Sequence, residues 1–144
     1  MKNTLFLLLI TVGLFSCQKD DDTNSNSTIT TVNLAATAST GTWRITYYYD
    51  TDHEETSNYA GYAFTFAGGN VLTATQAGSP TVTGTWTTGK DDSKVKLILS
   101  FTTPASFSEI SDDWHVTSRT DTKIVMTDVS GGNGGTDFLT FEKN

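Results

Sequence analysis

Hydrophobic and polar side chains alternate with a period of two along most of the chain after about residue 40. Such alternation is typical of β-strands with one buried and one exposed face, because successive strand side chains point to opposite sides of a sheet. In the first such segment the alternation places Trp43, Ile45, Tyr47 and Tyr49 inside and Tyr48 outside. The pattern predicts eight strands, with apolar positions within 43–49, 62–66, 71–75, 82–86, 95–101, 114–116, 124–126 and 138–141.

The segments between these strands are short and carry Gly, Pro, Asn or Asp, the residues that tight turns require. They fall at 68–70, 78–80, 89–93, 119–121 and 130–135. Local hairpins of this kind form a meander, and closure of a meander into a barrel removes its unpaired edges. We therefore predict an all-β fold, an eight-stranded antiparallel up-and-down meander barrel. A two-sheet sandwich is the main alternative, but it expects crossing connections for which the sequence gives no sign.

Two short helical segments are also predicted. Residues 34–38 can form one helical turn at the entrance of the domain, and residues 104–110 can form another turn between the fifth and sixth strands. In the second segment Phe107 and Ile110 are three residues apart, so both can lie on one helical face. We expect them to plug one end of the barrel.

The N-terminus has the pattern of a secretory signal. Lys2 precedes an apolar run over residues 5–15, and a small residue, Ser16, follows this run. The run is too short for a transmembrane helix, which needs about 20 residues. The segment Leu14-Phe15-Ser16-Cys17 resembles the lipobox of bacterial lipoproteins. By that resemblance residues 1–16 are a lipoprotein signal peptide, and Cys17 becomes a mature N-terminus that carries an acyl lipid such as palmitate and anchors the protein to the outer membrane.

Residues 17–39 are interpreted as a lipidated flexible tether. The part after the cysteine consists mainly of Asp, Thr, Asn and Ser, which bury too little apolar surface to offset their ordering entropy. The sequence Lys19-Asp20-Asp21 resembles the lipoprotein export signal of Bacteroidetes, which implies exposure on the cell surface. An ordinary polar linker, or an acidic retention signal of other bacteria, remains the alternative.

Residues 40–144 form one predicted domain, since two halves would each be too small for a core of their own. Cys17 is the only cysteine, so the domain contains no disulfide framework, thiol nucleophile or zinc finger. Loss of residues 1–16 removes one lysine and leaves eight Lys and Arg against 16 Asp and Glu. So acidic a chain repels phosphate backbones, and nucleic acid is therefore excluded as a partner.

The sequence shows no constellation for catalysis, so we predict no enzyme, no metal and no cofactor. His53 lies in an acidic loop over 50–55, where a weak calcium or zinc site is the alternative to a solvated hairpin loop, which we favour. His115 is flanked by core-facing Trp114 and Val116 and is expected to point outward. The glycine-rich stretch 130–137 lacks the Asp spacing and the repetition of calcium-binding nonapeptides, so we interpret it as a flexible hairpin tip.

Gly41-Thr42-Trp43 opens the first strand, and a second Gly-Thr-Trp stands at 84–86. With this motif at the first strand, eight predicted strands and a lipobox, the chain resembles the short lipocalin-like domains of Bacteroidetes lipoproteins over about residues 40–143. The resemblance implies that Gly41 and Trp43 close the base of the barrel, with the ring of Trp43 packed under a late cation such as Arg119. It extends to residues 64–66, 114–116 and 120–124.

Two functions remain open. In the first, the barrel binds a small apolar or amphipathic ligand inside, with Arg44 or Arg119 as a polar anchor at a rim. The lining side chains are then Tyr47, Tyr49, Tyr62, Phe64 and Trp86. In the second, the barrel is a filled interaction or structural module that binds a protein or glycan through its outer face or loops. An eight-stranded barrel is either just filled by side chains or holds one small ligand, and rings this large favour a packed core. The sequence does not identify a protein partner.

Overall fold

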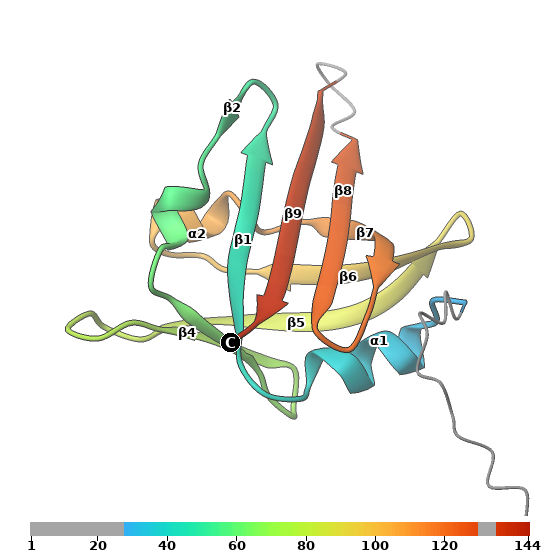
Figure 1. The fold of residues 1–144 in the computed structure, drawn as a ribbon, viewed down its shortest axis with the longest axis horizontal. Coiled ribbons are helices and arrows are strands. Elements are labelled where there is room, and N and C mark those ends of the chain that lie inside the picture. Colours follow the sequence, from blue (N-terminus) through green and yellow to red (C-terminus); the bar gives the residue numbers. More distant parts are fainter. Residues whose placement is uncertain (1–27, 130–134) are drawn as a thin grey trace, which may run out of the picture.

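The computed structural model describes residues 28–129 and 135–144 (Figure 1). The helical elements are α1 (Thr31–Ala38), the 3-10 helix η1 (Thr56–Tyr59) and α2 (Ala105–Ser108). The strands are β1 (Trp43–Asp50), β2 (His53–Glu54), β3 (Ala63–Phe66), β4 (Val71–Thr75), β5 (Val82–Asp91), β6 (Lys94–Ser100), β7 (Asp113–Arg119), β8 (Lys123–Val129) and β9 (Thr136–Lys143). Over this part of the chain, no helix is both long and apolar enough to cross a bilayer.

The strands form a closed antiparallel barrel in sequential order. From β3 to β9 each strand pairs with the next one along the chain, and β1 pairs with both β3 and β9. Within the described ranges this barrel has eight strands, and β2 is a two-residue addition that folds back onto the end of β1 (Figure 1). The predicted meander barrel is thus confirmed, because short turns between neighbouring strands leave no other simple pairing.

β1 contains a β-bulge that reverses the predicted phase of its second half. The register of the β1–β9 pair shifts between Ile45 and Tyr47, so Tyr48 is buried while Tyr47 is 41% exposed. A one-residue shift moves every following side chain to the other face of the sheet. The prediction that Tyr47 and Tyr49 face the interior is therefore wrong, and so is the prediction that Tyr48 faces outward.

Aromatic side chains fill the interior of the barrel. Phe64 and Phe66 are buried, and the ring of each lies edge-on to Phe141, with centroids 5.2 and 5.5 Å apart. Trp86 lies edge-on to Phe66 at 5.4 Å. These T-shaped contacts are the geometry that the ring quadrupole favours. The contacts show a packed aromatic core.

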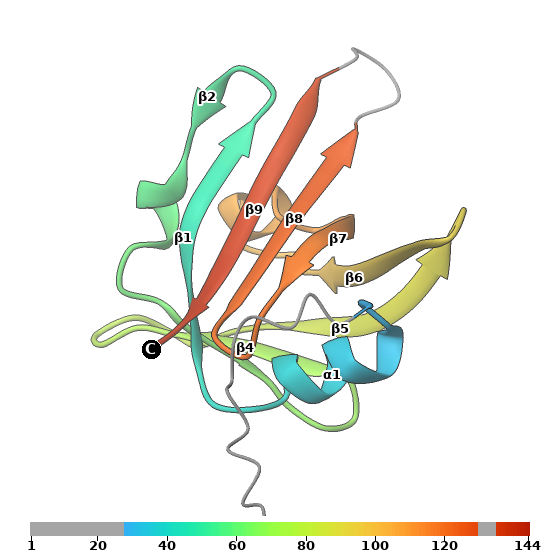
Figure 2. The same cartoon turned by 45° about the vertical axis from the view of Figure 1, so that its right-hand side comes forward.

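α1 is longer than the single predicted turn and belongs to the core. Thr30 caps the helix in a capping box, because its hydroxyl accepts from the Asn33 N–H and the Asn33 amide oxygen accepts from the Thr30 N–H. Leu34 and Ala38 are fully buried, and Figures 1 and 2 show the helix below the barrel beside β5. The flexible tether predicted for residues 17–39 therefore does not include α1, because the apolar side chains of this helix are buried against the barrel.

α2 plugs the end of the barrel where β1 ends, as predicted. Phe107 and Ile110 are buried, and the Phe107 ring contacts Tyr59 and Phe101 edge-on, with centroids 5.6 and 5.2 Å apart. The Tyr48 hydroxyl donates to the backbone carbonyl oxygen of Glu109, next to Ile110, at 3.1 Å. Because the bulge in β1 turns Tyr48 inward, it provides the hydroxyl that holds this plug.

Candidate functional site on the outer barrel face

Three aromatic side chains lie together on the outside of the barrel. Tyr47 and Tyr49 point outward from β1, and Phe138 stands directly opposite Tyr49 on β9. The two tyrosine rings are 6.4 Å apart and nearly parallel, and Phe138 lies 6.5 and 6.3 Å from them. Tyr47 and Phe138 are 41% and 37% exposed. We call these three residues the outer aromatic cluster.

One acidic side chain, Glu54, borders this cluster. Glu54 on β2 is the cross-strand partner of Tyr49, so the two side chains share the outward face. Glu54 is exposed, and within the described ranges its carboxylate makes no ion pair or hydrogen bond. Asp137 precedes Phe138 and therefore lies on the opposite face of β9, where it accepts a 2.7 Å hydrogen bond from the Thr51 N–H. The cluster therefore combines ring faces with negative charge.

His53 is exposed beside the cluster and is held by two carboxylates. Its Nδ1 contacts Asp52, and its Nε2 lies 2.5 Å from Glu55 Oε1. The hydrogen bond with Asp52, followed by that with Glu55, raises the pKa of His53 above its usual value. By contrast, burial and the charges of Lys94 and Lys96 lower the pKa of His115. Protonated His53 thus offsets charge that belongs to Asp52 and Glu55.

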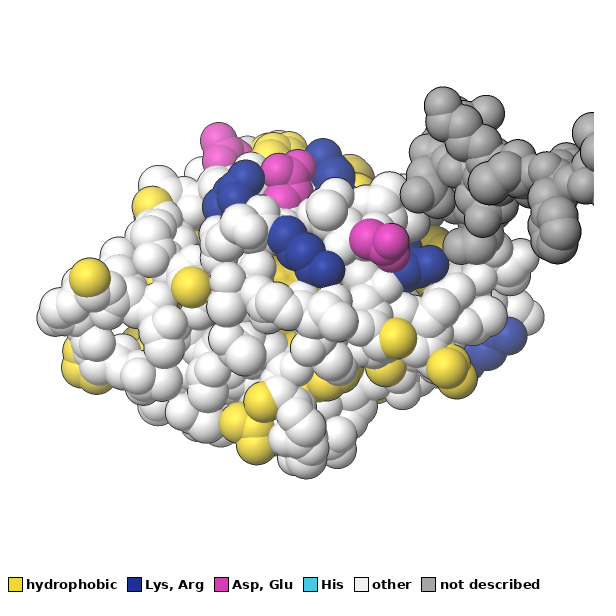
Figure 3. Space-filling view, turned by 60° about the horizontal axis from the view of Figure 1, so that its bottom comes forward, with side chains coloured by type: hydrophobic (Ala, Val, Ile, Leu, Met, Phe, Trp, Pro, Cys, Tyr) yellow, Lys and Arg dark blue, Asp and Glu magenta, His cyan; other side chains and the backbone are white. Residues whose placement is uncertain are grey.

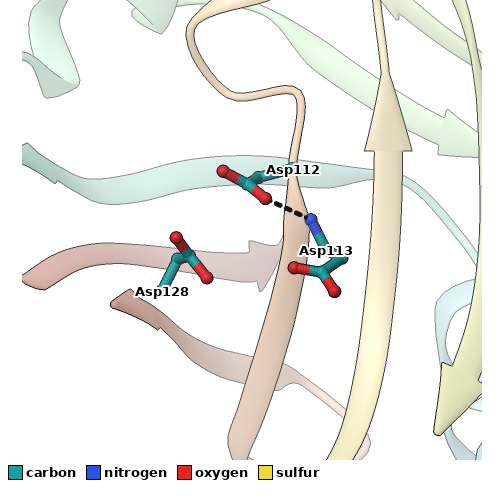
Figure 4. A group of neighbouring side chains, drawn as sticks. All are labelled: Asp112, Asp113 and Asp128. Atoms are coloured by element: carbon teal, nitrogen blue, oxygen red, sulfur yellow. Dashed lines mark hydrogen bonds between the residues drawn. The ribbon is translucent and has the colours of Figure 1, made fainter. Parts of the chain in front are cut away.

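A second acidic group, which the sequence did not suggest, joins β7 to β8. Carboxylate oxygens of Asp112, Asp113 and Asp128 lie within 4.8 Å of one another (Figure 4). Asp113 is paired with Lys96 at 3.3 Å, and Asp112 accepts the Asp113 N–H at 2.7 Å. Burial is the main cause that raises the pKa of Asp112. Acidic groups at the surface are common without a bound ion, so this group by itself does not define a metal site.

The structure does not gather the predicted lining residues around one cavity. Tyr47 and Tyr49 lie outside, while Phe64 and Trp86 are buried in the packed core. Tyr62 lines an open hollow of about 520 Å³ on the surface, with Pro80, Thr81, Val82, Thr83, Thr103 and Pro104. A shared ligand site for these residues stays a prediction that their placement does not favour.

Trp43 seals the base of the barrel. Its ring is fully buried, its indole N–H donates to the Ala38 carbonyl oxygen at 2.9 Å, and Lys143 Nζ lies 5.2 Å from the ring centroid. The late cation over the ring is thus Lys143. Gly41 has a φ of +73°, which favours glycine and turns the chain from α1 into β1.

Arg119 lies at the same base and not among the predicted lining aromatics. Its guanidinium donates to the Thr37 hydroxyl of α1 and lies 3.6 Å from Asp121. Both Arg119 and Lys143 line an open hollow of about 500 Å³ beside α1. Figure 3 views the molecule from below and shows Lys and Arg side chains on this face, interspersed with Asp and Glu.

Four predicted site residues lie outside the described part of the chain: the lipidation residue Cys17 and the export-signal residues Lys19, Asp20 and Asp21. Lipid attachment and export therefore stay predictions of the sequence.

No family model matches the chain, and no significant match is found among curated proteins or solved structures. The barrel is consistent with the lipocalin-like resemblance, but the family itself stays a prediction. The function must therefore be argued from the geometry alone.

Proposed function

We propose that this barrel is a non-enzymatic binding module whose partner docks on the outer face of β1 and β9. The main support is the outer aromatic cluster, in which Tyr47 and Phe138 leave more than a third of their surface exposed. Tyrosine and phenylalanine are enriched in interfaces, because they bury a large area at a low cost in conformational entropy. The bulge in β1 supports the same proposal, since bulges re-aim side chains next to functional sites.

An apolar ligand inside the barrel is the less supported function. Phe64 and Trp86, which would line its cavity, pack instead against Phe141 and Phe66 at ring distances near van der Waals contact. A ligand there would have to displace these rings, and interiors at this packing density do not open without cost.

The location of binding separates the two functions. We expect NMR titrations of the full chain with a peptide library, an oligosaccharide library and a fatty acid to shift the signals of Tyr47, Tyr49 and Phe138, with little change at core residues such as Met126. Tyr47→Ala combined with Phe138→Ala should abolish these shifts, while Ile98→Ala, an exposed apolar residue on β6, should preserve them. Saturable shifts confined to the core, or none at the cluster, would refute the outer-face proposal.

We further propose that the module is a lipoprotein, anchored at the outer membrane by lipid on Cys17 and exposed on the cell surface. An N-terminal lipid would fix the barrel to the membrane by the 13 residues 18–30, most of them polar, that precede α1. More than one acyl chain is needed for stable anchoring.

Replacement of Cys17 by serine should remove the lipid and move the protein from the detergent phase to the aqueous phase in phase partitioning. Serine keeps the size of the side chain but lacks the thiol that accepts the lipid. Ser16→Ala is the matched control, since alanine is also small and should preserve processing. A Cys17→Ser variant that still partitions with membranes as the parent does would refute lipid anchoring.

A further inference from the structure

We infer that the partner on the outer aromatic cluster is a cationic polypeptide segment, with an Arg or Lys side chain that lies over Tyr49 and pairs with Glu54. This inference rests on the proposed function and specifies the chemistry of its partner. The register gives one outward row across three strands, because Glu54 on β2 faces Tyr49 on β1 and Tyr49 faces Phe138 on β9. One carboxylate and two rings thus stand side by side at the spacing of neighbouring strands, about 4.8 Å.

Glu54 is the acidic residue of this loop that shares the outward face with the cluster. His53 is already held by Asp52 and Glu55. Within the described residues no cation pairs with Glu54. The basic residue of β1, Arg44, is engaged with Glu142 at 3.6 Å.

The other carboxylates at this end of the barrel lie on the opposite face of the strands from this row. Asp50 follows Tyr49 on β1 and Asp137 precedes Phe138 on β9, so each alternates with an outward-facing residue. Burial, together with the charges of these two carboxylates, raises the pKa of the inward-facing Tyr48. The negative charge that a partner on the outer row would meet is therefore that of Glu54.

A cationic polypeptide fits this combination better than other partners. The face of a tyrosine ring attracts an ammonium or guanidinium group, and the methylene stem of Lys or Arg covers apolar ring surface at the same time. A neutral glycan would stack on the rings and donate a hydroxyl hydrogen bond to Glu54, but it would leave the negative charge of Glu54 without a counterion. An anionic lipid surface would be repelled by it.

The test uses two labelled octapeptides and the full chain in a mild non-ionic detergent. One peptide alternates Arg with Leu, and the other carries Gln in place of each Arg. In fluorescence anisotropy we expect the Arg peptide to bind more tightly than the Gln peptide, and its affinity to fall as salt rises. Glu54→Gln should lower the affinity for the Arg peptide by about threefold, because an exposed ion pair contributes only a modest free energy in water and the cation–π contact with Tyr49 remains. Asp92→Asn removes the same charge from the exposed β5–β6 turn and should change nothing.

Other outcomes distinguish failure of this inference from failure of the proposed function. One outcome is that both peptides bind with equal affinity, that Glu54→Gln leaves both affinities unchanged and that Tyr49→Ala lowers both. The cluster would then bind a partner, but not through a cation, and the inference would be refuted. If the Arg peptide binds and Tyr49→Ala leaves it unchanged, or if neither peptide binds, the inference is refuted. Self-association in sedimentation that Tyr49→Ala abolishes would identify a second copy of this chain as the occupant and would refute it as well. Thermal melting confirms that each variant is folded.

Discussion

Replacement of Trp43 by alanine should lower the free energy of unfolding by about 3–5 kcal/mol, the range for large aromatic truncations in cores. The side chain is fully buried at the base, so its loss leaves a cavity between α1 and the start of β1. The change also leaves the Ala38 carbonyl without its indole donor and removes the ring under Lys143. Small domains have about 5–15 kcal/mol of stability in total, so the variant should lose a large share of its stability.

Urea denaturation followed by circular dichroism measures this loss. Tyr47→Ala is the control, because it also removes an aromatic ring from β1, but from the exposed outer face. Tyr47→Ala should lower the free energy of unfolding by much less than Trp43→Ala does. A loss below about 1 kcal/mol for Trp43→Ala, outside the core-truncation range, would contradict the closed base.

Replacement of Gly84 by alanine should destabilise the barrel by about 1–3 kcal/mol or more, the cost of overpacking a core. A Cβ at this position would overlap the carbonyl oxygen of Ser100 and lie 2.5 Å from Cδ1 of Phe101. Phe101 is buried and packs edge-on to Phe107, so it has no room to withdraw. Gly84, the glycine of the second Gly-Thr-Trp segment, is therefore required because no space exists for a Cβ atom at this position.

Gly68→Ala is the matched control for Gly84→Ala. It adds the same methyl group, but no heavy atom lies within 4 Å of the new Cβ, and φ at Gly68 is not in the left-handed region. Its stability should stay within about 0.5 kcal/mol of the parent, as for most surface substitutions. Equal melting temperatures for the two variants would show that the strand around Gly84 moves to accept a side chain.

The outward row of Glu54, Tyr49 and Phe138 shows how much of the candidate site can be predicted from the sequence. Leu139 and Phe141 are buried at a spacing of two, which indicates that Phe138 faces outward. Glu54 appeared only as part of an acidic loop. Three consecutive tyrosines at 47–49 fit either phase of a strand, so the pattern of hydrophobic residues could not locate the bulge that precedes them.

The sequence by itself determined the number and the order of the barrel strands. Alternation with a period of two reports which residues share a face, and short turns report which strands are neighbours, and both signals are local. It also determined the aromatic plug at Phe107 and the burial of Trp43.

Only the tertiary structure decided the rest. The phase of β1 after its bulge is set by pairing with β9, at the far end of the chain, because the partner strand fixes which register closes the barrel. The inclusion of α1 in the core depends on a surface that only the folded barrel provides for Leu34 and Ala38. In the same way, Glu54, Tyr49 and Phe138 become neighbours only through the β2–β1–β9 ladder, because no sequence period connects residues so far apart.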